Sequence, residues 1–141
     1  MKYMLDTNTC IFIMSRKPGA LAAFQQNGAD GVAVSAITLA ELEYGISKSS
    51  RREENRNTLE AFLALVIILP FDGTAAAEYG ELRVNLQRKG TPIGMMDMLI
   101  AAHALAADLI LVTNNTREFE RIEPLKLEDW LNQNATPPPC Q

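Results

Sequence analysis

Short apolar runs recur along this chain, and amphipathic segments separate them. A run that does not alternate polar and apolar residues is typical of a strand covered on both faces, as the strands of parallel sheets are. Strands that alternate with helices indicate an α/β fold, in which a central parallel sheet lies between layers of helices. The predicted strands are residues 2–5, 31–34, 65–71 and 109–113, with a weaker fifth at 126–128.

Capping and helix-breaking residues predict the helices between these strands. Thr7 or Asn8 is expected to cap a helix that ends before the "KPG" at 17–19. Ser35 or Thr38 opens the helix that contains "LAELEYGISK". The other predicted helices are a short one around 21–25, residues 51–64 behind a capping box from Ser50 to Glu53, residues 72–89 with Gly90 as the stop, and one that begins near Gly94.

The length and composition fit one folded domain. The chain has 141 residues, of which 48% are hydrophobic and 21% charged, so it can bury a core. The domain is expected to span residues 1–131, and the polar, proline-rich residues 132–141 are expected to form a disordered tail. A formal net charge of −4 argues against nonspecific coating of nucleic acid, although a bound cation can reverse the field at one site.

Cysteine usage and hydropathy favour a cytoplasmic protein. Cys10 and Cys140 are far apart and imply no disulfide framework, and no signal-peptide pattern opens the chain. The apolar stretch at 95–112 is about as long as a minimal membrane span. However, it contains Asp97, His103 and Asp108, each of which is unfavourable in lipid. We therefore expect no association with a membrane.

Polar and acidic residues follow the predicted strands. Asp6 follows the first strand, residues 35–41 follow the second, and residues 113–115 follow the fourth. Because functional groups in such folds gather at the carboxyl ends of the strands, these segments are expected to share one edge of the sheet. Each acid has a structural explanation when taken alone, but together at one edge they favour a functional site.

Asp97 is the most conspicuous of these acids. It lies among methionines and leucine, in the first turn of the helix that begins near Gly94, on the same face as Ile100 and Ala101. The helix dipole alone would stabilise an acid there by about 0.3–1 kcal/mol. Asp6 has a comparable explanation, because aspartate often caps a helix.

The helix after the second strand carries two acids, Glu41 and Glu43. Glu41 shares a face with Ile37 and Tyr44, and Glu43 shares a face with Leu39 and Ile46. Both therefore have apolar neighbours, and periodicity does not choose between them.

Several carboxylates at one sheet edge would repel one another, and burial would raise their pKa values. A divalent cation relieves both effects. Mg²⁺ and Mn²⁺ prefer oxygen ligands and keep several waters, so two or three acids suffice. The sequence therefore predicts a site for a divalent metal ion.

Four collinear fragments resemble the PIN-domain toxins of the VapC type. They are "YMLDTN" at 3–8, "SAITLAELEYG" at 35–45, "GTPIGMMDMLIAAHA" at 90–104 and "LVTNNTREFERI" at 111–122. The resemblance covers residues 2 to about 130. It implies a three-layer α/β/α domain with a central, mostly parallel sheet of four or five strands. It also implies a ribonuclease site that depends on Mg²⁺, with Mn²⁺ as a substitute.

The resemblance assigns the family's three acids to Asp6, Glu41 and Asp97, which selects Glu41 over Glu43. Many members have a fourth acid where Asn115 stands here, and Glu118 is the nearest acid to that position. Under this hypothesis Asp6 and Asp97 hold the ion directly, and Glu41 acts through water or orients the attacking water. Asn115 and Glu118 complete the site. Hydrolysis would leave a 5′-phosphate and a 3′-hydroxyl.

Two further groups of residues are candidates for substrate binding. Thr7 and Thr113 can position metal ligands or phosphate by hydrogen bonding. Arg51 and Arg52 belong to the densest basic cluster, which also contains Lys48 and Arg56. The alternative for this cluster is a solvated helix start, balanced by the two glutamates at 53 and 54.

The resemblance also implies partners. These are an RNA substrate, often tRNA, a VapB-type antitoxin that blocks the site, operator DNA bound through that antitoxin, and a second copy in a homodimer.

One alternative function is a protein-binding module on a degenerate nuclease fold, suggested by Asn115 in place of an acid. A phosphoacceptor receiver domain is disfavoured, because it would need adjacent acids after the first strand. His103 lies about 120° around the helix from Asp97, so we expect it to be structural, as we do Cys10 and Trp130.

Overall fold

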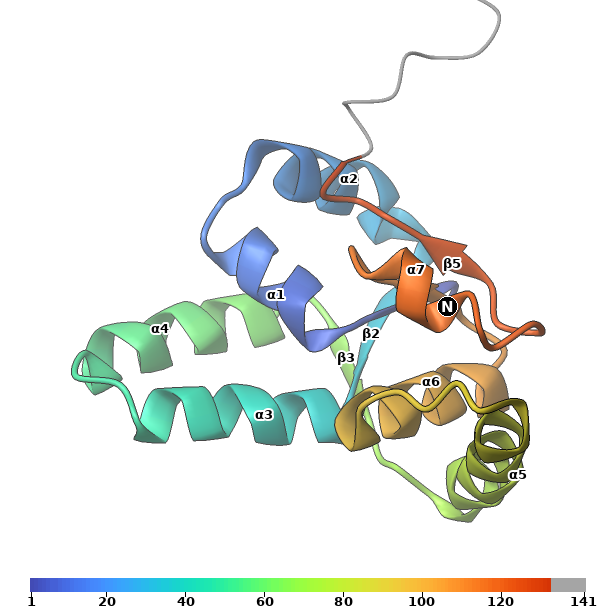
Figure 1. Cartoon of the computed structure of the whole chain (residues 1–141). Coiled ribbons are helices and arrows are strands. Elements are labelled where there is room, and N and C mark those ends of the chain that lie inside the picture. Colours follow the sequence, from blue (N-terminus) through green and yellow to red (C-terminus); the bar gives the residue numbers. More distant parts are fainter. Residues whose placement is uncertain (133–141) are drawn as a thin grey trace, which may run out of the picture.

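A computed structural model describes residues 1–132 and shows one five-stranded sheet with helices on both faces (Figure 1). All four strand pairs are parallel, and the order of the strands is β3-β2-β1-β4-β5. All five predicted strands and the predicted parallel sheet are therefore confirmed. The strands are β1 (Tyr3–Leu5), β2 (Val32–Ser35), β3 (Ile67–Leu69), β4 (Ile110–Val112) and β5 (Leu127–Glu128).

The helices alternate with the strands as the sequence predicts. The helices are α1 (Thr7–Met14), α2 (Pro18–Asn27), α3 (Ala36–Ser47), α4 (Arg52–Leu63), α5 (Gly73–Lys89), α6 (Met95–Ala106) and α7 (Thr116–Phe119), with a 3₁₀ turn η1 (Gly28–Asp30).

Only Asn132 of the predicted tail, residues 132–141, lies within the described residues. Its backbone N–H donates a hydrogen bond to the side chain of Asp129.

The sheet separates two apolar layers. Tyr3 and Leu5 of β1 join the cluster formed with α1, α2, α3 and α4, which Trp130 also enters. Met4, between them in sequence, points to the other face and joins the cluster formed with α5 and α6. This alternation follows from the two-residue period of a strand, and it confirms the three-layer α/β/α arrangement.

The edge strand β3 departs from the prediction of full burial. Ile67 and Ile68 are 51% and 41% exposed, although the run that contains them is continuously apolar. β3 pairs only with β2 and lies at the edge of the sheet, so its side chains are covered less completely than those of β1. An apolar run does not distinguish an edge strand from a central one.

Two helix starts test the expected caps. α1 is capped by Asp6, whose Oδ1 accepts a hydrogen bond of 2.8 Å from the backbone N–H of Thr9. The sequence offers Asp6 for this cap as well as Thr7 and Asn8, and the structure uses Asp6. The Ser50 capping box does not form at α4, because Arg51 occupies the N-cap position without a side-chain bond. Helix α2 is longer than the predicted segment around 21–25, since it spans Pro18–Asn27, and α7 is not among the predicted helices. Three other boundaries follow the prediction. Ser35 caps α3, Asp72 caps α5, and Gly90 ends α5 at a φ of 69°.

The direction in which the strands are added reverses between β1 and β4. The chain leaves β1 toward β2 and β3 on one side of the sheet, whereas β4 is followed by β5 on the other side. Ligands of open α/β sheets bind at such a reversal, outside the carboxyl ends of the strands. Asp6, directly after β1, is tied to this edge because its backbone N–H donates to the carbonyl of Val112 at 3.0 Å.

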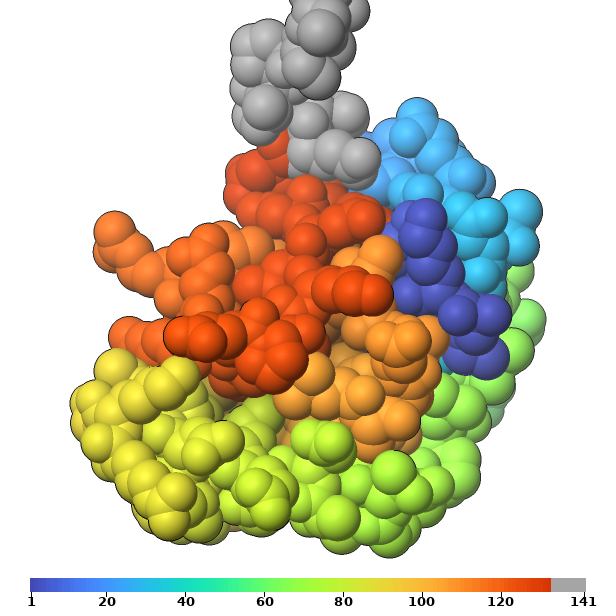
Figure 2. Space-filling view, turned by 90° about the vertical axis from the view of Figure 1, so that its right-hand side faces the viewer, coloured from blue at the N-terminus to red at the C-terminus, as the bar shows by residue number. Residues whose placement is uncertain are grey.

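Helix α5 and the segment that follows β4 lie together on one face of the molecule. Figure 2 shows these regions side by side, with the N-terminal residues next to them. Lys89 and Glu123 form an ion pair of 3.8 Å between them, and Arg121 donates to the carbonyl of Pro92 at 3.0 Å. Within residues 1–132, every helix is too short or too polar to cross a membrane.

Candidate active site

Four carboxyl groups from separate elements lie close enough to repel one another. Asp6 follows β1, Glu41 lies on α3, Asp97 lies in the first turn of α6, and Glu118 lies on α7. Burial, together with repulsion from Glu118, Asp6 and Glu41, raises the pKa of Asp97 to about 6. The structure therefore brings all four predicted acids into one electrostatic site.

Asp6 is a buried acid of this site. Its side chain is 4% exposed, and burial raises the pKa of its carboxyl group. Hydrogen bonds from Thr113 and Thr9 oppose this rise in pKa, while repulsion from Glu41 adds to it. Asp6 thus both caps α1 and presents a carboxylate, so its structural and functional explanations are compatible.

Thr113 is a buried partner of Asp6. It is fully buried, and its hydroxyl bonds the Asp6 carboxylate while accepting a hydrogen bond of 3.0 Å from the backbone N–H of Asn115. The contacts of Thr113 are therefore with a site acid and with the backbone that leads to α7.

Glu41 and Glu43 have different surroundings. The Thr7 hydroxyl donates a hydrogen bond of 2.5 Å to Glu41 Oε1, which joins the start of α1 to α3. Glu43 instead accepts two hydrogen bonds from Arg56, of 2.8 Å and 2.6 Å. That guanidinium holds the pKa of Glu43 below its usual value. The geometry thus places Glu41 with the other acids and pairs Glu43 with a cation.

Asn115 holds Glu118. The Asn115 side-chain amide donates a hydrogen bond of 2.7 Å to Glu118 Oε2 across the first turn of α7. Glu118 is the acid that most raises the pKa of Asp97 by charge, so its carboxylate faces the site. Asn115, which stands where the fourth acid is expected, is therefore hydrogen bonded to Glu118, an acid three positions later.

The donor set fits a hard divalent cation. Mg²⁺ is commonly bound by one or two carboxylates together with several waters, and not by a closed cage of side chains. Within residues 1–132, no three His, Cys, Asp or Glu side chains are arranged so that they could together hold a metal ion. A cation at this site would therefore be held by two carboxylates and by water. A cation between Asp6 and Asp97 would lower the pKa of both groups, because it relieves their repulsion.

The predicted basic cluster lies beyond the far end of α3. Figure 1 shows the turn between α3 and α4 at the end of α3 that points away from α6. Arg51 and Arg52 begin α4 there, and Arg51 pairs with Glu54 at 3.5 Å on an exposed surface. Arg56 is bound to Glu43. The structure therefore does not bring Arg51 and Arg52 together with the four acids.

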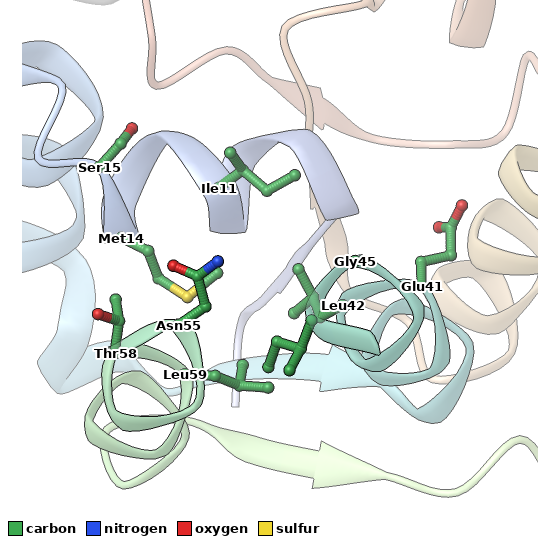
Figure 3. Close-up of a pocket in the computed structure, with 10 residues that line it drawn as sticks. Ile11, Met14, Ser15, Glu41, Leu42, Gly45, Asn55, Thr58 and Leu59 are labelled. Atoms are coloured by element: carbon green, nitrogen blue, oxygen red, sulfur yellow. The ribbon is translucent and has the colours of Figure 1, made fainter. Parts of the chain in front are cut away.

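An apolar groove runs from Glu41 between α1, α3 and α4. Figure 3 shows Glu41 at one end of the groove, beyond the apolar side chains. Its volume is about 370 Å³, and Asn55 and Thr58 of α4 add polar groups to its wall. Sequence reasoning missed this groove because three separate helices form it. The apolar residues in its lining include Ile11, Met14, Leu42, Ile46 and Leu59.

His103 is structural, as expected. It is buried, its Nδ1 lies 2.7 Å from the Ser35 hydroxyl, and its ring packs edge-on against Phe71 at 5.4 Å. Burial lowers the pKa of His103. Cys10 and Trp130 are likewise buried.

The sheet order and the four acids define an α/β/α domain with an acidic site at the carboxyl edge of its sheet. The chain belongs to the PIN-domain family, since the model of that family matches residues 3–124. It is 45% identical over 130 residues to the tRNA(fMet)-specific endonuclease VapC of Salmonella typhimurium, covering 92% of this chain and 98% of the relative. It is also 45% identical over 134 residues to ribonuclease VapC2 of Rickettsia felis, with the same coverage.

A solved structure supports the same assignment. The structure of VapBC2 from Rickettsia felis bound to a DNA fragment from its promoter matches with a TM-score of 0.88 and 42% identity. The match covers 92% of this chain and 99% of that one. The resemblance to PIN-domain proteins of the VapC type is therefore confirmed, as is the fold.

Proposed function

We propose that this protein is a metal-dependent endoribonuclease of the VapC type, the toxin of a toxin–antitoxin pair. The observation that carries this proposal is the convergence of four carboxylates, one with a pKa of about 6, at the carboxyl edge of the sheet. The names of the relatives, which describe ribonucleases and a tRNA-specific endonuclease, support the choice of RNA as substrate.

Asp6 and Asp97 would hold the Mg²⁺ or Mn²⁺ ion. When bound, such an ion lowers the pKa of a coordinated water and neutralises charge on the phosphate oxygens. Glu41, fixed by the hydroxyl of Thr7, orients the attacking water and accepts its proton. In-line attack on phosphorus breaks the bond to the 3′-oxygen, which takes up a proton from solvent water, so that the products carry a 5′-phosphate and a 3′-hydroxyl.

Three residues position these groups. Thr7 and Thr113 hold Glu41 and Asp6 by hydrogen bonds, and Asn115 holds Glu118. For Thr7 and Thr113 this is one of the two roles that the sequence suggests, the positioning of metal ligands and not of phosphate. Arg51 and Arg52 are proposed to contact RNA only at a distance from the cleaved bond, because they lie beyond the far end of α3.

The groove beside Glu41 is the proposed docking site for a VapB-type antitoxin. Its apolar lining suits apolar side chains of a partner segment, and a segment seated there would end at the acids and block them. The DNA-bound VapBC structures of relatives support a partner that also binds operator DNA. A homodimer remains a prediction, which light scattering of the purified chain tests.

Incubation of the purified protein with total tRNA tests the proposed function. Cleavage is expected with Mn²⁺ or Mg²⁺ and not with EDTA, and the new ends should carry a 5′-phosphate. The Asp6→Ala variant should be inactive under the same conditions. Intact tRNA in every lane would contradict the proposal and favour the alternative, a protein-binding module on this fold.

A further inference from the structure

An exposed aromatic residue lies on the helix that carries Glu41. Tyr44 is 66% exposed, and the ammonium group of Lys48 lies 4.8 Å from the centre of its ring. One face of the ring is thus near a cation. We call these two residues the Tyr44–Lys48 strip. The roles proposed above for the acids and the groove do not include it.

The geometry of α3 relates the strip to the site. An α-helix turns about 100° and rises about 1.5 Å per residue, so Tyr44 lies about 4.5 Å and Lys48 about 10.5 Å beyond Glu41 along the helix axis. Lys48 is rotated from Glu41 by only about 20° and Tyr44 by about 60°. The strip therefore leads outward from the acids along the exposed side of α3.

The strip does not belong to the groove. Leu42 and Gly45, which line the groove, are rotated from Glu41 in the opposite direction to Tyr44. Ile37 is rotated in the same direction as Tyr44, and it packs against the cluster formed with α5 and α6. Tyr44 thus lies on the flank of α3 that faces the α6 side of the site.

Lys48 is available for a phosphate group. Of the neighbouring cations, Arg56 is bound to Glu43 and Arg51 pairs with Glu54, whereas Arg52 forms no ion pair in the part of the chain that the structure describes. Within residues 1–132, Lys48 has no acidic partner at ion-pair distance, and its recorded contact is with the Tyr44 ring. A cation at this position offsets the repulsion between the four acids and an incoming RNA backbone.

We infer that the Tyr44–Lys48 strip binds an unpaired stretch of the RNA substrate next to the cleaved phosphate. Tyr44 stacks on one nucleobase, and Lys48 contacts a phosphate beyond it. This inference rests on the proposed function and adds a requirement to it. Aromatic side chains stack on bases only where those bases are unpaired, as in loops, bulges and ends. The strip therefore selects RNA that has unpaired bases at the cleavage position.

Binding of two RNA probes tests the inference. The first is a fluorescein-labelled hairpin with a seven-nucleotide loop, and the second is a blunt duplex with the same stem. Fluorescence anisotropy measures the affinity of the protein for each probe, with Ca²⁺ in place of Mg²⁺ or Mn²⁺. A gel confirms that the probe stays intact. Tyr44→Leu is expected to weaken hairpin binding by about 5- to 100-fold and to leave duplex binding unchanged. The matched control Tyr44→Phe retains the ring and should bind within about twofold of the wild type.

The Lys48→Gln variant is expected to change RNA binding in a different way. Lys48→Gln should weaken binding of both probes and should reduce the slope of log affinity against log salt by about one contact. Circular dichroism and melting curves establish that each variant is folded. A folded Tyr44→Leu protein that binds the hairpin as tightly as the wild type would overturn the inference. It would equally be overturned if that variant lost only self-association, since Tyr44 would then belong to a protein interface.

Different experimental outcomes would contradict the inference about the Tyr44–Lys48 strip and the proposed nuclease function. If wild-type protein cleaves tRNA and Tyr44→Leu cleaves it with the same KM, the nuclease stands and the strip has no role in substrate binding. If wild-type protein cleaves nothing while Tyr44→Leu still loses hairpin binding, the strip binds RNA and the nuclease proposal falls.

Discussion

Two glutamates on one helix show how the surroundings of a charge indicate its role. Glu43 is bound by both nitrogens of the Arg56 guanidinium, so its charge is balanced within the fold. Glu41, two residues earlier, receives one hydroxyl hydrogen bond from Thr7 and faces Asp6 and Asp97. The fold compensates one carboxylate and leaves the other beside charges of the same sign. An acid left uncompensated among other acids would be stabilised by an external cation, and this contrast distinguishes the candidate site from the surface.

The largest expected difference is in catalysis. Glu41→Gln should lower kcat for tRNA cleavage by about 10²-fold, since the amide cannot accept a proton from the attacking water. Glu43→Gln removes a charge from the same helix and should lower kcat by less than about twofold, because Glu43 does not contact the reacting atoms. Initial rates with saturating Mn²⁺ measure both. Equal losses in the two variants would remove the distinction between these acids.

Thr7 tests whether Glu41 must be held in place. Thr7→Val keeps the shape of the side chain and removes the hydrogen bond to Glu41, so kcat should fall by about 10-fold with little change in KM. Thr7→Ser retains the hydroxyl and should recover most of the activity. If serine and valine behave alike, the hydrogen bond is not what positions Glu41.

The pH dependence of stability tests the repulsion at Asp97. The folded pKa of about 6 lies above the unfolded value of about 3.9, so the folded state favours the protonated acid. This contribution to stability is present below about pH 4 and is lost as the pH rises to about 6. Without metal at pH 7.5, Asp97→Asn should therefore be more stable than the wild type by about 1–2 kcal/mol, after allowance for solvent screening. The advantage should vanish at pH 4 in urea titrations.

Asn115 gives the smallest expected change. Asn115→Ala removes the amide that holds Glu118, and kcat should fall by about three- to fivefold. Asn115→Asp restores the acid of other family members but repels Glu118, so it should raise the concentration of Mg²⁺ needed for half-maximal rate. A rate series against Mg²⁺ concentration separates these two effects. An unchanged Mg²⁺ dependence in both variants would place Asn115 and Glu118 outside the metal site.

Local patterns predicted most of the fold and part of the site. The continuous apolar runs located all five strands, and the position of Asp6 after β1 placed it at the functional edge. Glu41 could not be distinguished from Glu43 by periodicity, because both have apolar neighbours three or four residues away. The family resemblance made that choice, and the Thr7 contact across 34 residues gives a structural reason for it.

Other features depend on contacts that no local pattern encodes. The burial of Thr113 beside Asp6, the groove between three helices and the exposure of β3 all follow from tertiary packing. The sequence leaves the cap of α1 open among Asp6, Thr7 and Asn8, because all three residue types are favoured at that position, and the structure uses Asp6. Sequence reasoning located the edge of the sheet at which the four acids meet, and packing determines how each side chain is held there.

Calorimetric titration of the metal-free protein with Mn²⁺ tests the central claim most directly. A shared cation site predicts saturable binding of about one ion with a millimolar or lower Kd, which should be lost in Asp97→Asn and kept in Glu43→Gln. Because the pKa of Asp97 is about 6, binding at pH 6 should also release protons, which titration in buffers of different ionisation enthalpy detects. Absence of binding at 10 mM Mn²⁺ (roughly the upper end of the millimolar range for weak protein sites), or equal binding by Asp97→Asn, would contradict the account.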